Sequence, residues 1–93
     1  MKATIRSHVL ADSDDVVECE GYHYFPSDAV RLDFLEKTER TARDLECPHS
    51  VQFYDVVVEG QRYPRAAWCY EAPQPYKAQT AGRYGFWRDV AVG

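Results

Sequence analysis

The sequence predicts a mainly β protein: one small domain of antiparallel sheets with one or two short helical turns. Aromatic residues make up 14% of the 93 residues, and aromatic side chains pack well on pleated sheets. Short apolar runs alternate with turn-forming residues, whereas no long stretch has helical periodicity. A chain of this length has room for one core, so residues 1–93 are expected to form a single domain.

The first half of the chain predicts short strands joined by polar loops. A hairpin is expected over residues 2–11, because polar Arg6-Ser7-His8 separates two apolar runs. The acidic residues 12–15 are typical of a loop, and Ser27 with Asp28 favours a short helical turn or a simple turn. Alternating apolar and polar residues predict further strands at 16–19, 22–25 and 30–36.

The second half begins with a polar stretch, 37–44, that predicts a solvated connection before Leu45 returns to the core. Residues 52–58 form the clearest strand, because they are rich in aromatic and β-branched residues. Glu59-Gly60 favours a hairpin turn before a return strand that Pro64 interrupts. The remaining expectations are a bend at 72–75, a short helix at 76–81 and a last strand over 84–92.

Charge and cysteine content bear on partners and location. The net charge is −4 and basic residues are scattered among carboxylates, so we expect no nucleic-acid partner. No apolar run approaches membrane-spanning length and the N-terminus lacks an apolar signal core, so we expect no membrane partner. The odd number of cysteines (Cys19, Cys47 and Cys69) favours reduced thiols and a cytoplasmic location.

Six short motifs in order resemble the bacterial family called domain of unknown function 427, which carries a nucleotidyltransferase-like label. They are Tyr24-Phe25-Pro26, Val30-Arg31-x-Asp33, Cys47-Pro48, Ala66-Ala67-Trp68-x-Tyr70, Pro73 and Phe86-Trp87. The resemblance runs from Lys2 to Val92. It implies a β-tent-like arrangement of antiparallel sheets, a fold in which some relatives bind zinc through paired cysteines and others hold small ligands in an aromatic cage. It implies no established activity.

One segment departs from the pattern of that family. Members usually follow Cys-Pro with an aromatic residue, a Lys and a Gly, whereas Cys47-Pro48 is followed here by His49-Ser50. If the Lys-Gly pair contacts an anionic ligand in the family, this chain has lost that contact, and His49 is the local residue that could replace it.

Residue spacing predicts a pocket. Trp68 and Tyr70 are two residues apart on a predicted strand and so face one side, and the same holds for Arg31 and Asp33. If both faces line one concavity, the result is an apolar pocket with a few polar groups, as small-molecule sites usually are. The alternative is that Trp68 belongs to the core and that Arg31 and Asp33 form a surface ion pair.

We therefore predict a small-molecule-binding module whose ligand is unknown. Its predicted ligand-binding residues are Tyr24, Arg31, Asp33, Cys47, Tyr54, Trp68 and Tyr70. Tyr24, Trp68 and Tyr70 would form the apolar wall, while Cys47 and Tyr54 would lie at the floor or rim. Arg31 would hold an anionic or carbonyl group, and Asp33 would orient Arg31.

Two other function classes stay open. A nucleotidyltransferase-like enzyme would place Mg²⁺ on Asp12, Asp14 or Asp33, although no glycine-rich phosphate loop follows any predicted strand. A protein-interaction module would use an exposed sheet edge or aromatic patch. The sequence predicts no catalytic residue, so whether the protein is an enzyme also stays open.

The cysteines leave two interpretations of Cys47 open and predict no metal site. Cys47 and His49 are spaced as a thiol nucleophile and its base could be, but Cys47 could equally pack as a small buried hydrophobe. The three cysteines are far apart, and no Cys-x-x-Cys occurs. Structural zinc sites usually need two close ligand pairs, so we predict no metal site and no cofactor.

Overall fold

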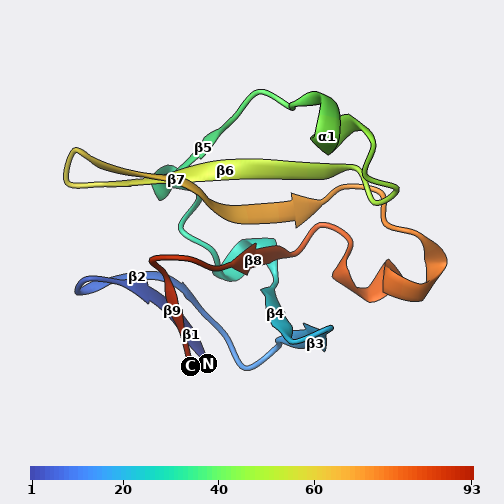
Figure 1. The fold of residues 1–93 in the computed structure, drawn as a ribbon. Helices are drawn as coiled ribbons and strands as arrows, with labels where there is room; N and C mark the ends of the chain where they lie inside the picture. The colour runs from blue at the N-terminus through green and yellow to red at the C-terminus, as the bar shows by residue number, and fades with distance from the viewer.

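Two antiparallel sheets make up the chain, which a computed structural model describes over residues 1–93 (Figure 1). The smaller sheet has the strand order β2-β1-β9, and the larger has the order β3-β4-β8-β7-β6-β5. The strands are β1 (Lys2–Ile5), β2 (His8–Asp12), β3 (Val17–Cys19), β4 (Tyr22–Phe25), β5 (Leu35–Lys37), β6 (Val51–Val58), β7 (Gln61–Tyr70), β8 (Tyr84–Phe86) and β9 (Ala91–Val92). The predicted fold class, mainly β with antiparallel sheets, is confirmed.

Helical structure is confined to short turns. The one α-helical turn is α1 (Ala42–Leu45), and three segments are 3₁₀ turns: Ser27–Ala29, Leu32–Phe34 and Pro75–Thr80. None of these helices is long or apolar enough to cross a lipid bilayer.

The two chain ends lie side by side and close the smaller sheet (Figure 1). The Lys2 N–H donates to the Gly93 carbonyl at 3.2 Å, and the Gly93 N–H donates to the Lys2 carbonyl at 2.9 Å. These bonds extend the antiparallel pairing of β1 with β9. The smaller sheet therefore depends on both ends of the chain.

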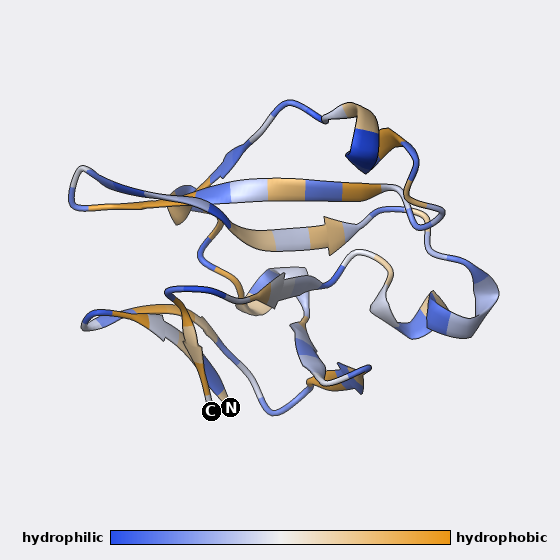
Figure 2. Ribbon diagram, viewed as in Figure 1, coloured by the Kyte–Doolittle hydropathy of each residue, from blue (hydrophilic) through white to orange (hydrophobic).

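The larger hydrophobic cluster includes residues from both sheets, and Figure 2 shows apolar segments on β1 and β2 as well as on β6 and β7. Phe25 on β4 and Ala67 on β7 belong to it, whereas their chain neighbours Tyr24 and Trp68 belong to a second, smaller cluster. Because successive side chains on a strand point to opposite faces, the two clusters lie on opposite faces of the larger sheet.

Three expectations about local structure are wrong, each for a physical reason. Residues 30–36 are not one strand, because Leu32–Phe34 forms a 3₁₀ turn in which the Phe34 N–H donates to the Arg31 carbonyl. The segment at 84–92 is two strands in different sheets, separated by a turn in which Arg88 has a φ of 58°. Leu45 does not return to the core but is 70% exposed at the end of α1.

A fourth expectation is also wrong, because strand β7 runs through Pro64 without the predicted interruption. A β-bulge absorbs the proline. The pairing register with β6 shifts between Tyr54 and Val56, opposite residues 64–66. Arg65 in this bulge has a φ of 51°, and its N–H donates to Asp55 Oδ1 at 2.9 Å. The bulge leaves the Arg65 N–H without a carbonyl partner on β6, and the Asp55 carboxylate accepts its hydrogen bond instead.

A buried ion pair links this bulge to α1. The Thr41 hydroxyl accepts the Asp44 N–H, and the Asp44 carboxylate accepts the Thr41 N–H, which together form a capping box. The same carboxylate, 5% exposed, accepts two hydrogen bonds from the Arg65 guanidinium at 2.9 and 3.2 Å. Arg65 outweighs the opposing effect of burial and holds the pKa of Asp44 below its ordinary value.

This ion pair predicts how stability depends on pH. A lowered pKa in the folded state contributes stability above the ordinary aspartate pKa of about 3.9, and that contribution is lost as the pH falls through the folded pKa. Asp44→Asn should lower the free energy of unfolding at neutral pH by about 2–4 kcal/mol, because Arg65 loses its charged partner. Urea unfolding followed by tryptophan fluorescence measures this change.

The variant should also lose less stability than the wild type on acidification below about pH 4, since the group that titrates is gone. Asp33→Asn is the matched control, because Asp33 pairs with Arg31 while 62% exposed, and exposed pairs contribute little. An Asp44→Asn protein whose stability at neutral pH equals that of the control would contradict the assignment.

Candidate functional site

A row of four paired residues crosses the larger sheet and forms the base of the candidate site. Tyr24 on β4 pairs with Gly85 on β8, Gly85 pairs with Trp68 on β7, and Trp68 pairs with Phe53 on β6. Directly paired residues point to the same face of a sheet, so these side chains share one face. Tyr22 and Tyr70 lie two residues from members of the row and point to that face as well.

Gly85 provides the space that the indole of Trp68 occupies. A Cβ at this position would lie 2.6 Å from Cζ2 and 2.7 Å from Cε2 of Trp68, far closer than carbon atoms pack. The requirement for glycine is therefore steric, since the ring lies directly over the backbone of β8. A second ring, that of Tyr24, packs edge-on against Trp68 with centroids 5.9 Å apart.

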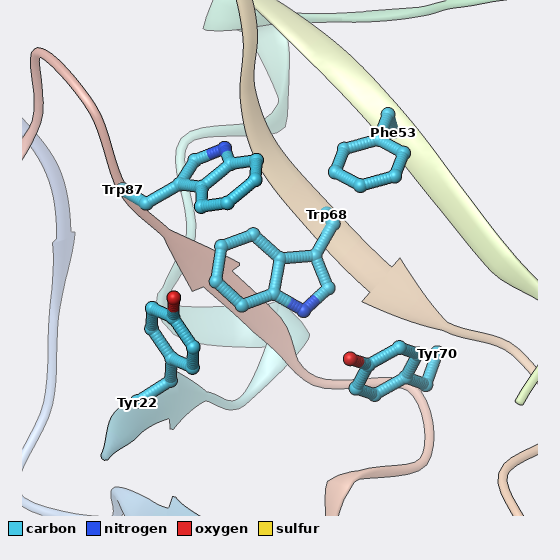
Figure 3. A pocket seen from close by; sticks show the side chains of 5 residues that line it. All are labelled: Tyr22, Phe53, Trp68, Tyr70 and Trp87. Atoms are coloured by element: carbon cyan, nitrogen blue, oxygen red, sulfur yellow. The ribbon is translucent and has the colours of Figure 1, made fainter. Parts of the chain in front are cut away.

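Five aromatic side chains line a hollow on this face: Tyr22, Phe53, Trp68, Tyr70 and Trp87 (Figure 3). The hollow is open to solvent on one side and has a cavity volume of about 100 Å³. Trp68 meets Tyr22 and Trp87 edge-on at centroid distances of 5.1 and 5.4 Å. Phe53 and Trp87 are stacked at 6.0 Å with an interplanar angle of 25°. The hollow thus has aromatic walls on several sides and no charged lining residue.

The two indole groups have different hydrogen-bonding states. Trp87 Nε1–H donates to the Arg65 carbonyl at 2.5 Å, and the Trp87 backbone N–H donates to the Ala66 carbonyl at 3.1 Å. Trp68 is only 4% exposed, and its buried Nε1–H lies beside the Tyr24 hydroxyl, a contact that lowers the pKa of Tyr24 against the larger effect of burial. The bulge on β7 therefore fixes Trp87, whereas the Trp68 indole is held by the aromatic side chains packed around it.

Three of the lining rings each have a positively charged side chain of the protein over the ring. The Arg65 guanidinium lies 3.9 Å from the Phe53 centroid, and the Arg88 guanidinium lies 4.8 Å from the Trp87 ring. Lys77 Nζ lies 5.0 Å from the centroid of Tyr70 and forms an ion pair with Glu20 at 3.0 Å. Burial lowers the pKa of Lys77, but Glu20 and Tyr70 outweigh it and the pKa is raised, so this ammonium stays charged.

Two buried groups beneath and beside the hollow are held neutral. Burial, reinforced by the neighbouring Tyr70, raises the pKa of Tyr24. Burial raises the pKa of the Cys69 thiol to about 11, so Cys69 is an unreactive thiol at neutral pH. Neither group is poised for proton transfer or nucleophilic attack.

His49 ties the loop before the Pro75–Thr80 turn to this cluster. Its Nδ1 accepts the Gln74 N–H at 3.0 Å, and its Nε2 lies 3.0 Å from the Tyr76 hydroxyl. Because Nδ1 accepts, the ring proton is assigned to Nε2, which donates to Tyr76. The ring also packs against Tyr70 with centroids 5.2 Å apart. Both nitrogens are engaged, so His49 is not a free base for Cys47.

The structure brings together part of the predicted site. Trp68 and Tyr70 both line the hollow, which confirms that they share a face. Tyr24 is 1% exposed and supports Trp68 from beneath instead of lining the hollow. Cys47 packs at the edge of the same aromatic cluster and also does not reach the lining.

Arg31, Asp33 and Tyr54 lie away from the hollow, so their expected placement beside it is wrong. Arg31 pairs with Asp33 at 3.2 Å on the exposed Leu32–Phe34 turn, and its guanidinium lies over Phe34. Phe34 packs against the larger cluster, on the other face of the sheet. Tyr54 also faces that cluster and packs against Tyr84 at 5.5 Å, because it is one residue out of phase with Phe53.

Sequence reasoning missed three lining residues: Tyr22, Phe53 and Trp87. Tyr22 is two residues from Tyr24, so its shared face follows from strand periodicity once Tyr24 is placed. Phe53 depends on the pairing register of β6 with β7, which residue types alone do not give. Trp87 lies two residues after Gly85, just beyond β8. Its position on this face could be inferred only once Gly85 was known to lie beneath Trp68.

The carboxylates considered for nucleotidyl transfer do not gather. Nowhere in the chain do three His, Cys, Asp or Glu side chains come close enough to hold a metal ion together. Asp33 is engaged by Arg31, and the acidic stretch at residues 12–15 includes Asp15, which pairs with Arg83 at 3.2 Å. The geometry therefore offers no metal-holding carboxylate cluster for that chemistry.

The close approach of Gly85 and Trp68 gives a direct prediction. Gly85→Ala should displace the Trp68 ring from the floor of the hollow and lower the free energy of unfolding by about 1–3 kcal/mol, because the added methyl overpacks the contact. Chemical denaturation measures the stability, and the indole N–H signal of Trp68 in a ¹H–¹⁵N NMR spectrum reports the displacement.

Gly82→Ala is the matched control. Gly82 has a φ of +71° and nothing within 4 Å of an added Cβ, so alanine strains its backbone but leaves Trp68 in place. Both variants should be destabilised, and only Gly85→Ala should move the Trp68 signal. An unmoved Trp68 signal in Gly85→Ala would show that the ring does not lie where we place it.

Comparison with known proteins places the chain in a family. No curated protein matches it. The family model described as a domain of unknown function, DUF427, matches residues 1–92. Because that match covers essentially the whole chain, the protein belongs to the DUF427 family.

Proposed function

We propose that this domain binds a small molecule with a flat apolar body in the aromatic hollow. The observation that carries the proposal is the convergence of five aromatic rings from β4, β6, β7 and the segment after β8 on one space open to solvent. Ligand pockets are typically concave and mostly apolar, with aromatic side chains enriched in their walls.

The size of the hollow limits the ligand. A cavity volume of about 100 Å³ is well below the usual range for ligand sites, roughly 300–1,000 Å³. A single ring fits such a volume, with any second ring in the part open to solvent, whereas a nucleotide with its phosphates does not. Burial of a ring of about 100 Å² would contribute about 2.5 kcal/mol before the cost of association, so fragment-sized compounds should bind weakly.

Retention of the hollow has a cost for so small a domain. Tyr22 is 41% exposed, and Phe53, Tyr70 and Trp87 are half-buried although they are large and mostly apolar. A chain of 93 residues has few aromatic side chains beyond those its core requires. Grouping several of them around open space, instead of packing them inward, supports a binding role for this face.

The proposal predicts the effect of opening one wall. Phe53→Ala should weaken the binding of one-ring and two-ring aromatic fragments about tenfold, because the ring stacked with Trp87 is lost. Ligand-observed NMR on a fragment panel, with thermal unfolding in parallel, measures affinity and stability together.

Arg31→Ala is the control for that experiment. Arg31 is exposed and lies beside Phe34, away from the hollow, so this variant should bind fragments as the wild type does. Equal binding by wild type and Phe53→Ala, or a panel in which no fragment affects any lining residue, would rule out the hollow as a ligand site.

A further inference from the structure

Tyr22 is the lining residue that lies at the mouth of the hollow. It is 41% exposed, whereas the other four lining residues are half-buried or buried. Its ring stands edge-on to both indoles, with centroid distances of 5.1 Å to Trp68 and 6.4 Å to Trp87. Figure 3 shows Tyr22 and Tyr70 on different sides of the Trp68 indole. The position of Tyr22 therefore sets how wide the hollow opens.

The strand that carries Tyr22 is weakly attached to the sheet at this end. β3 and β4 form a tight hairpin, and β3 is an edge strand of the larger sheet. β4 pairs with β8 only at Tyr24 and Phe25, so Tyr22 has β3 as its one neighbouring strand. Segments with few neighbours open locally at a low free energy. The hairpin tip, which we define as residues 18–22, can therefore move without disrupting the rest of the sheet.

One ion pair joins this tip to another part of the chain. Glu20 Oε2 lies 3.0 Å from Nζ of Lys77, which belongs to the Pro75–Thr80 turn. The other carboxylate of the tip, that of Glu18, lies 3.7 Å from His23 and so stays within the hairpin. The Lys77 side chain is only 8% exposed, and partly buried pairs are screened by salt much less than surface pairs. Glu20 is thus the charged anchor of the tip.

The same lysine contacts a second wall of the hollow. Lys77 Nζ lies 5.0 Å from the ring centroid of Tyr70, which lines the hollow. Glu20, its ion-pair partner, precedes Tyr22 by two residues on the hairpin. The Glu20–Lys77 pair therefore connects the hairpin that carries one wall to the ring that forms another.

We propose that the hairpin tip is a flap at the mouth of the hollow and that the Glu20–Lys77 ion pair holds this flap closed. With the flap closed, the cavity volume of about 100 Å³ suits one aromatic ring. When the pair breaks, Tyr22 moves away from the two indoles and the hollow encloses a fused two-ring compound. The ion pair thus limits the size of the guest. The size limit rests on the proposed function, whereas the flap itself is observable without a guest.

The flap is tested first in the absence of any ligand. Glu20→Gln removes the ion pair, and Glu18→Gln is the matched control because its carboxylate contacts only His23 of the same hairpin. The protein is labelled with ¹³C in its tyrosine rings, and a Tyr22→Phe variant assigns the Tyr22 signals. Glu20→Gln should move these signals toward those of free tyrosine, because the ring leaves the two indoles. It should also speed amide hydrogen exchange in residues 18–22 about tenfold, and Glu18→Gln should do neither.

A second variant separates opening of the flap from loss of overall stability. Glu20→Gln leaves the Lys77 ammonium buried without a counter-ion, which also destabilises the whole fold. Lys77→Met removes the pair but keeps a long side chain against Tyr70. It should move the Tyr22 signals as Glu20→Gln does, while amide exchange in β6 and β7 stays at the wild-type rate. Unmoved Tyr22 signals in both variants, or exchange that rises equally in β6 and β7 of Lys77→Met, would overturn the flap.

Phenol and 2-naphthol then test the size limit, since both are neutral at neutral pH and carry one hydroxyl but differ by one ring. NMR titration of each variant gives both affinities. The ratio of 2-naphthol affinity to phenol affinity should rise about fivefold in Glu20→Gln and Lys77→Met and stay unchanged in Glu18→Gln. An unchanged ratio in a variant whose flap is open would overturn the size limit, while binding itself would uphold the proposed function. If neither compound shifts any lining residue in any variant, the proposed function fails and the size limit with it.

Discussion

The contacts of Arg65 are the interaction on which the hollow most depends. Its guanidinium forms the buried ion pair with Asp44 and lies over the ring of Phe53. Its carbonyl accepts the indole N–H of Trp87, and its own N–H is held by Asp55. Two walls of the hollow, Phe53 and Trp87, are thus positioned by one residue in a left-handed conformation within a bulge. A local irregularity in β7 therefore determines how these walls stand relative to each other.

The larger sheet has apolar residues on both faces, and the two faces serve different ends. One contributes Phe25, Ala67 and Phe86 to the cluster shared with the smaller sheet, where they are almost completely buried. The other carries Trp68 and its aromatic neighbours, and Gly85 leaves room for the indole against the backbone. An alanine at position 85 would raise the ring by occupying that space. The hollow thus exists because Gly85 lets the Trp68 ring lie against the backbone of the sheet, while the surrounding rings extend further from the sheet.

Strand periodicity was sufficient for part of this arrangement. Alternation along one strand placed Trp68 and Tyr70 on the same face, and that relation is local to the sequence. Pairing between strands is not local: a shift of one residue exchanges Phe53 for Tyr54, and both are aromatic. The predicted position of Arg31 was wrong for another reason, since Leu32–Phe34 forms a 3₁₀ turn in spite of the alternating apolar residues at 30–34. Which side chains converge was therefore decided by register and by turns, which single-strand patterns do not encode.

An abundance of aromatic residues does not by itself identify what an aromatic hollow binds. Rings with free faces beside a carboxylate suit cations, because the ring quadrupole and the negative charge act together. Here cations of the chain already lie over three of the rings, and the carboxylates Asp44 and Glu20 are used in neutralising two of them. What remains available to a guest of the proposed kind is apolar aromatic surface. The proposed recognition therefore rests on shape and apolar contact, and not on a free carboxylate of the hollow.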